Sequence, residues 1–95
     1  MGKYPIHRVD ANTGQLLHAF ARHGCQSRAI HQPLDFLIAI PTTRHGWVNA
    51  IVEFKDADTP MQQSQTEFID FWPGLTAVVR TPDDVNALVK LVQES

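Results

Sequence analysis

The chain has very little cysteine and no long apolar run. Cys25 is the only cysteine among 95 residues, so no internal disulfide can form. Cys25 together with His23 also falls short of the four ligands of a structural zinc site. No run of about 18 apolar residues exists that would span a membrane, and the first residues lack the apolar stretch of a signal peptide. These absences together indicate a cytoplasmic protein without a membrane segment.

Repeats, low-complexity tracts and linkers are also missing, so we expect a single domain over residues 1–95. The net charge of −2 argues against a protein that coats nucleic acid through a general excess of positive charge. The charge is nevertheless uneven, because residues 1–50 hold five Lys or Arg against two acids, together with all five histidines. This asymmetry is compatible with a basic face, and equally with a solvated surface that binds nothing.

Hydrophobic periodicity and turn residues predict the element order α-β-β-β-α-β-α. Helices are expected at residues 12–23, 61–72 and from Pro82 onward. Strands are expected at residues 28–31, 35–40, 47–55 and 75–79. Asn12 and Gln15 match a capping box, Gly24 is a natural helix stop, and Thr81 can cap the last helix. The order is that of an α/β domain with one sheet flanked by helices.

Two of the predicted strands bring three charged residues together. Glu53 and Lys55 are two residues apart on one strand, so their side chains leave the same face. The other face of this strand is apolar, with Val48, Ala50, Val52 and Phe54. If strands 35–40 and 47–55 form an antiparallel hairpin centred on Arg44, paired positions sum to 88 and Asp35 lies opposite Glu53. This register predicts two carboxylates and a lysine on one face.

Two like charges at paired positions repel each other unless a cation lies between them. Carboxylate oxygens suit Mg²⁺ or Mn²⁺, which can polarise a phosphoryl oxygen and lower the pKa of a bound water. Lys55 is placed to orient that water or to stabilise charge in the transition state. The spacing alone also fits an ordinary salt-bridge cluster at the end of a hairpin, so both interpretations remain open at this point.

Asp35 followed by Glu53-Phe54-Lys55 resembles the D…(D/E)-x-K signature of the PD-(D/E)XK nuclease superfamily. Further segments look like its small stand-alone VRR-NUC branch, which is common in phages and prophages: 8–12 (RVDAN), 35–39 (DFLIA), 52–55 (VEFK), 64–68 (SQTEF) and 76–80 (TAVVR). The resemblance covers roughly residues 8–92. It implies a restriction-endonuclease-like α-β-β-β-α-β core with one mixed sheet and an extra C-terminal helix.

The resemblance also implies roles for individual residues. Asp35, Glu53 and the main-chain carbonyl of Phe54 would bind Mg²⁺ or Mn²⁺, Lys55 would be the catalytic lysine, and Gln65 would support the site from the following helix. Gln15 stands where the family often has a glutamate, and it is either an accessory residue for a second metal or the capping-box partner named above. The proline that usually precedes the aspartate directly is displaced to Pro33.

By this resemblance the protein is a metal-dependent DNA endonuclease, acting on branched or flapped DNA as a homodimer in a host cytoplasm. Three residues are further candidates for contacts with DNA, namely His31, Arg44 and His45, although ordinary surface roles remain open for them. Two other classes of function also remain open. One is a nuclease-fold binding or assembly module with weak or no catalysis, and the other is a toxin–antitoxin or regulatory domain.

Overall fold

The computed structural model describes residues 11–95. The segment Arg8–Asp10, which contributes to the resemblance at the start of the first helix, lies outside the described residues. The elements along the chain are α1 (Ala11–Arg22), β1 (Gln26–Ala29), β2 (Phe36–Thr42), β3 (Gly46–Phe54), α2 (Gln63–Phe71), β4 (Thr76–Val79) and α3 (Pro82–Gln93). This is the predicted order, and the predicted C-terminal helix is present.

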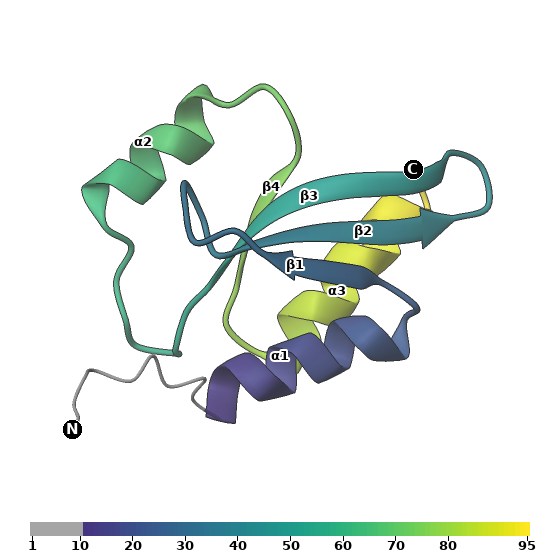
Figure 1. The fold of residues 1–95 in the computed structure, drawn as a ribbon, viewed down its shortest axis with the longest axis horizontal. Coiled ribbons are helices and arrows are strands. Elements are labelled where there is room, and N and C mark those ends of the chain that lie inside the picture. The colour runs from purple at the N-terminus through teal and green to yellow at the C-terminus, as the bar shows by residue number, and fades with distance from the viewer. Residues whose placement is uncertain (1–10) are drawn as a thin grey trace.

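The four strands form one mixed sheet in the order β1-β2-β3-β4 (Figure 1). The first three strands are antiparallel neighbours, whereas β4 runs parallel to β3. Helices α1 and α3 pack against each other and cover one face of the sheet. Helix α2 lies apart from them, beside the loop that precedes β2. The predicted α/β class with a mixed sheet is therefore confirmed.

The hairpin of β2 and β3 has the register expected from the sequence. Its pairs run from Thr42 opposite Gly46 to Phe36 opposite Val52, so the two residue numbers of each pair add to 88, as predicted. Asp35 and Glu53 occupy the next positions, immediately beyond the last pair. Because opposed residues share a face, this register places both carboxylates on the face that α1 and α3 do not cover.

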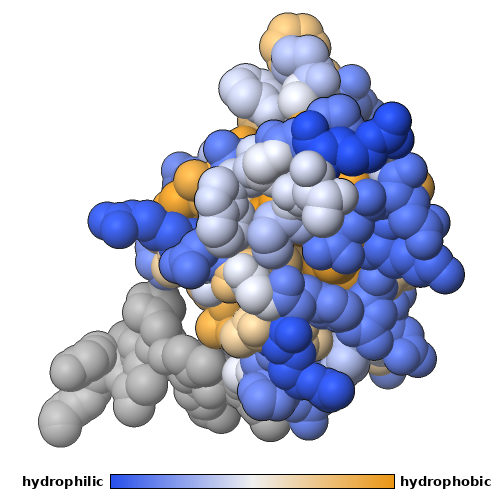
Figure 2. All heavy atoms as spheres, turned by 90° about the vertical axis from the view of Figure 1, so that its right-hand side faces the viewer, coloured by the Kyte–Doolittle hydropathy of each residue, from blue (hydrophilic) through white to orange (hydrophobic). Residues whose placement is uncertain are grey.

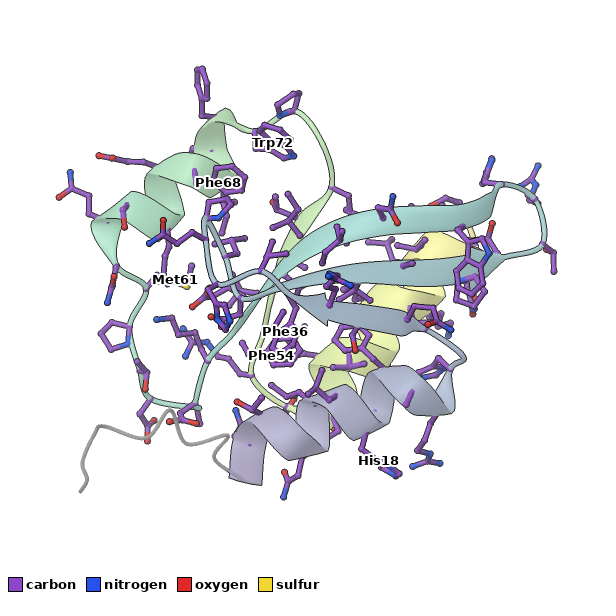
Figure 3. All side chains as sticks on the ribbon, viewed as in Figure 1. His18, Phe36, Phe54, Met61, Phe68 and Trp72 are labelled. Carbon is purple, nitrogen blue, oxygen red and sulfur yellow. The ribbon has the colours of Figure 1, made fainter. Side chains whose placement is uncertain are left out.

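The hydrophobic core lies between the sheet and the α1–α3 pair. Phe54 contributes the largest core side chain of β3, and its ring stacks on Phe36 with 4.5 Å between the ring centroids (Figure 3). The other stacking partner of Phe54 is Phe20, at 6.0 Å between centroids. The other buried core residues include Leu16, Ile38, Ile40, Ala50, Val52, Val79, Val85 and Val89. The predicted apolar face of β3 is thus the core face, and Glu53 projects from the opposite one.

Two predictions about α1 have different outcomes. The helix begins at Ala11, so Asn12 is its second residue and the prediction that Asn12 caps it is wrong. The Asn12 side chain instead donates a hydrogen bond to the main-chain oxygen of Lys55. The prediction that Gly24 ends the helix is confirmed. Gly24 has a φ of +78°, and its N–H donates the closing hydrogen bond to the main-chain oxygen of Ala21.

The boundaries of β1 and α2 also differ from the prediction. Strand β1 lies two residues earlier than expected, because His31 has a φ of +69° and the chain turns there. Helix α2 is shorter at both ends than the predicted range 61–72, and none of its nine residues is buried. By contrast, the predicted cap of α3 is confirmed, since the Thr81 side chain accepts a hydrogen bond from the Asp84 N–H.

Candidate functional site

Asp35 is held at the mouth of the β2–β3 hairpin by three hydrogen bonds. Its main-chain oxygen accepts from the N–H groups of Ile30 and His31 at 2.9 and 3.1 Å. Its carboxylate oxygen Oδ2 accepts from the N–H of Phe54 at 3.0 Å. These bonds fasten the last turn before β2 to the end of β3, and they fix the Asp35 carboxylate beside the position of Glu53.

Glu53 is the one buried charged side chain in the described part of the protein, with an exposed fraction of 3%. Its Oε2 accepts a hydrogen bond from Gln65 Nε2 at 2.8 Å and lies 3.6 Å from Lys55 Nζ. Its Oε1 is also buried, but it has no hydrogen-bond partner among residues 11–95. Burying a carboxylate oxygen without a hydrogen-bond partner costs folding free energy, so this atom is a buried, unsatisfied polar atom that needs an explanation.

The surroundings of Glu53 disfavour its charged form. Burial raises its pKa above the ordinary value of 4.5, and the neighbouring Asp35 raises the pKa further, by its charge and by a hydrogen bond that the protonated Glu53 can make to it. The Lys55 ammonium acts in the opposite direction but does not cancel the other two effects. A bound cation would reverse this balance, because positive charge between two carboxylates favours their ionised forms.

Lys55 is the first residue after β3, and its side chain is mostly buried. The exposed fraction of the side chain is 10%. Its main chain is bonded on both sides: the N–H donates to the Val79 oxygen at 3.0 Å, and the carbonyl accepts from Asn12 Nδ2 at 2.9 Å. Sequence reasoning missed the contact of Asn12, because the two residues are 43 positions apart and no motif links them.

Gln65 connects α2 to the site. One end of its side-chain amide donates to Glu53, and the other end accepts from the main-chain N–H of Gln62 at 3.0 Å. Beside it lies a hollow of about 460 Å³, lined by His31, Gln32, Pro33, Gln62, Ser64 and Gln65. None of these lining residues is acidic. The hollow therefore offers polar surroundings without a carboxylate of its own, beside the glutamine that bonds to Glu53.

The residues present fit one hard cation better than two. The described part of the chain contains no group of three or more His, Cys, Asp or Glu side chains arranged around a metal. Asp35 and Glu53 supply two carboxylates, one of them with an unpartnered oxygen. Mg²⁺ commonly takes one or two carboxylates and completes its shell with water and phosphate oxygens. A single ion, supported by the Phe54 carbonyl, is compatible with this donor set.

The other candidates lie in different places. Gln15 is exposed on α1. Arg44 and His45 lie in the β2–β3 turn, where their side chains contact the Ser95 oxygen at 3.4 and 3.3 Å. A strand of seven residues separates this turn from Asp35, roughly 23 Å. Of the three proposed DNA contacts, only His31 borders the candidate site.

The end of the molecule that carries this turn is mostly hydrophilic, with small hydrophobic patches between the polar side chains (Figure 2). Arg44 and His45 are exposed there. A contact with nucleic acid at this end would therefore be remote from the carboxylates.

Comparison of this chain with protein-family models, with curated proteins and with solved structures returns no match. Within the described residues, no helix has the length and apolar character needed to cross a membrane. The function of the protein is therefore inferred from the geometry around Glu53 and from the spacing of the D…E-x-K residues.

Proposed function

We propose that this protein is a divalent-metal-dependent DNA endonuclease that hydrolyses phosphodiester bonds. The observation that carries the proposal is the buried Glu53 carboxylate: its Oε1 has no hydrogen-bond partner among residues 11–95, and the group has the Asp35 carboxylate and the Lys55 ammonium as neighbours. Burying an unpaired carboxylate oxygen does not stabilise the fold, and a bound cation would supply the partner that this oxygen lacks. A plain surface salt bridge does not account for it, because Glu53 is buried.

The residues divide the chemistry among them. A bound Mg²⁺ or Mn²⁺ would polarise the phosphoryl oxygen and lower the pKa of an attacking water. Asp35 and Glu53 would hold the ion, and Gln65 fixes the orientation of the Glu53 carboxylate by its hydrogen bond. The Lys55 ammonium places positive charge where negative charge develops on the phosphate, or it orients the water.

DNA as the substrate is supported by the resemblance to the PD-(D/E)XK superfamily and its VRR-NUC branch. The uncharged hollow beside Gln65 is compatible with this, because it admits a strand without placing a carboxylate against its phosphates. The same resemblance supports a branched or flapped DNA substrate, a phage or prophage origin, and action in the host cytoplasm.

A homodimer is part of the proposal, since two sites are needed to cut opposite strands. Several aromatic side chains are exposed in the single chain: Trp47 at 56%, Trp72 at 44% and Phe71 at 87%. Aromatic residues are enriched at protein interfaces. Their exposure supports association of two copies.

A second candidate function is a nuclease-fold module that binds DNA or assembles with partners without cleaving. The observation that favours it is the absence of a third His, Cys, Asp or Glu ligand within residues 11–95, together with the exposed, neutral Gln15. With two carboxylates the affinity for a metal is lower than in a site with three. The two functions differ in whether added metal produces cleavage.

The test is incubation of the protein with duplex, flap and four-way-junction DNA in the presence of Mg²⁺ or Mn²⁺. We expect cleavage of at least one substrate by the wild type, and none by Asp35→Asn or Glu53→Gln. Asp58→Asn is the matched control, because Asp58 is an exposed acid three residues after Lys55. Cleavage by both site variants at the wild-type rate would refute the proposed nuclease, and binding without cleavage would favour the module.

A further inference from the structure

The main chain that follows β3 is held by two side chains from distant parts of the sequence. Asn12, in the first turn of α1, donates its side-chain amide to the Lys55 oxygen at 2.9 Å. Arg80, directly after β4, binds the next residues: its Nη1 contacts the oxygens of Asp56 at 2.6 Å and Thr59 at 2.8 Å. The same atom lies 3.3 Å from the Ala57 oxygen.

Arg80 is itself fixed to the start of α3. Its main-chain N–H donates to Asp84 Oδ2 at 2.8 Å, and the same oxygen accepts from the Thr81 N–H at 3.2 Å. The preceding residue, Val79, accepts the hydrogen bond from the Lys55 N–H. Residues 55–59 are therefore tied to α1, to β4 and to the capped end of α3, all of which belong to the packed half of the protein.

This fastening matters because the hydrogen bond from the Lys55 N–H to Val79 is the last main-chain bond between β3 and β4, and residues 56–62 belong to no helix or strand. Helix α2, which the segment leads into, has no buried residue, so it contributes little to holding the segment in place. The Nζ of Lys55 reaches Glu53 at 3.6 Å through a long, flexible side chain. A main chain that frays at the end of β3 would move this ammonium away from the carboxylate, since lysine rotamers are numerous.

We propose that Asn12 and Arg80 are positioning residues that act through Lys55: they fix its main chain so that its ammonium stays beside Glu53. The proposal rests on the proposed nuclease function for its catalytic consequence, but the placement of Lys55 is a property of the protein alone. Neither residue touches the phosphate or the metal in this role. Their effect on hydrolysis passes entirely through Lys55.

The catalytic test is a double-mutant cycle with Asn12→Ala, Arg80→Lys and Lys55→Ala. Asn12→Ala and Arg80→Lys are each expected to lower kcat about tenfold with KM and metal affinity unchanged, because a misplaced catalytic group loses rate and not binding. In the Lys55→Ala background either substitution should change kcat less than about twofold. Equal losses in both backgrounds would overturn the proposal, as would wild-type kcat in Asn12→Ala.

Asn86→Ala is the matched control. Its side-chain Oδ1 accepts a hydrogen bond of similar length, 2.8 Å, from His23 Nε2, and that contact also joins distant segments. It lies on α3, away from Lys55. We expect its kcat to equal that of the wild type, so a loss of rate in this control equal to that of Asn12→Ala would contradict a specific role for Asn12.

A second readout does not depend on cleavage. In protein labelled with ¹³C-lysine, the Cε signal of Lys55 should shift in response to the substitution Glu53→Gln, because the two side chains are in contact. We expect this response to be lost in Asn12→Ala and Arg80→Lys and kept in Asn86→Ala. Retention in both site variants would refute the positioning role. A wild type that shows the response but cuts no DNA would refute the nuclease and leave the positioning role supported.

Discussion

At the scale of single residues, Glu53 links stability to pH. Its pKa is raised above 4.5, first by burial and then by the charge of Asp35. The folded state therefore binds this proton more tightly than the unfolded chain does. The resulting stabilisation is fully present below pH 4.5 and is lost as pH rises through the raised pKa.

The first prediction follows from this linkage. At pH 7 to 8 without metal, Glu53→Gln should unfold at a higher temperature than the wild type, because it removes a buried charge and keeps the shape of the side chain. Thermal melts from pH 4 to 8 check this, and the difference should shrink toward the acid end. A variant that melts below the wild type at pH 8 would contradict the stated environment of Glu53.

Lys55 gives the second prediction at this scale. Lys55→Ala should lower turnover strongly while the midpoint for Mg²⁺ or Mn²⁺ activation changes little, because Lys55 acts on water or phosphate and does not bind the cation. Steady-state rates over a metal titration separate the two effects. A variant that needs far more metal but reaches the wild-type rate at saturation would assign Lys55 to metal binding instead.

Single residues also show the limits of the sequence. The alternation of apolar residues in 47–55 and the position of the turn were sufficient to predict the hairpin register, and hence the meeting of Asp35 with Glu53. The role of Asn12 was not predictable, because its partner is a main-chain oxygen 43 residues away. Main-chain acceptors leave no trace in the identity of the residue that carries them.

At the scale of elements, α2 is the helix with the least buried surface in the described part of the chain. Its Phe68 and Trp72 rings stack on each other at 5.3 Å (Figure 3) but neither residue is buried. Among the described residues, the side-chain hydrogen bond that links α2 to another element is the one that Gln65 donates to Glu53. A helix with so little buried surface depends on few contacts for its position.

The third prediction concerns this attachment. Gln65→Ala should lower the hydrogen-exchange protection of the α2 amides by at least about tenfold, since a hydrogen bond to a charged group contributes about 1.5–3 kcal/mol. Protection in α1 and α3 should stay unchanged. Gln63→Ala is the control, because Gln63 bonds only within the helix to Glu67. Equal loss of protection in both variants would contradict an anchoring role for Gln65.

Element boundaries were predictable where local chemistry sets them. Thr81 and Asp84 announce the start of α3, and Gly24 marks the end of α1. The bounds of β1 were wrong because pairing with β2, and not the propensity of residues 28–31, selects which residues extend. Which residues form a strand at the edge of a sheet depends on tertiary pairing, so the local sequence alone does not predict its bounds.

At the scale of the whole molecule, the exposed aromatic residues lead to the fourth prediction. Light scattering at micromolar concentration should give twice the mass of one chain. Trp47→Ser combined with Phe71→Ser should shift this toward the monomer, because both rings are exposed in the single chain. Leu91→Ser, another exposed apolar residue at 66%, is the control. A wild type at the single-chain mass that still cuts both strands of a junction symmetrically would refute the dimer.

The placement of a divalent ion between Asp35 and Glu53 is tested most directly by Mn²⁺, whose unpaired electrons broaden nearby nuclear resonances. At substoichiometric Mn²⁺ the amide signals of Asp35, Phe54 and Lys55 should broaden first in the wild type, and they should stay sharp in Asp35→Asn. If the strongest broadening falls instead at exposed acids such as Asp83 and Asp84, or is the same in both proteins, the cation does not bind at this site.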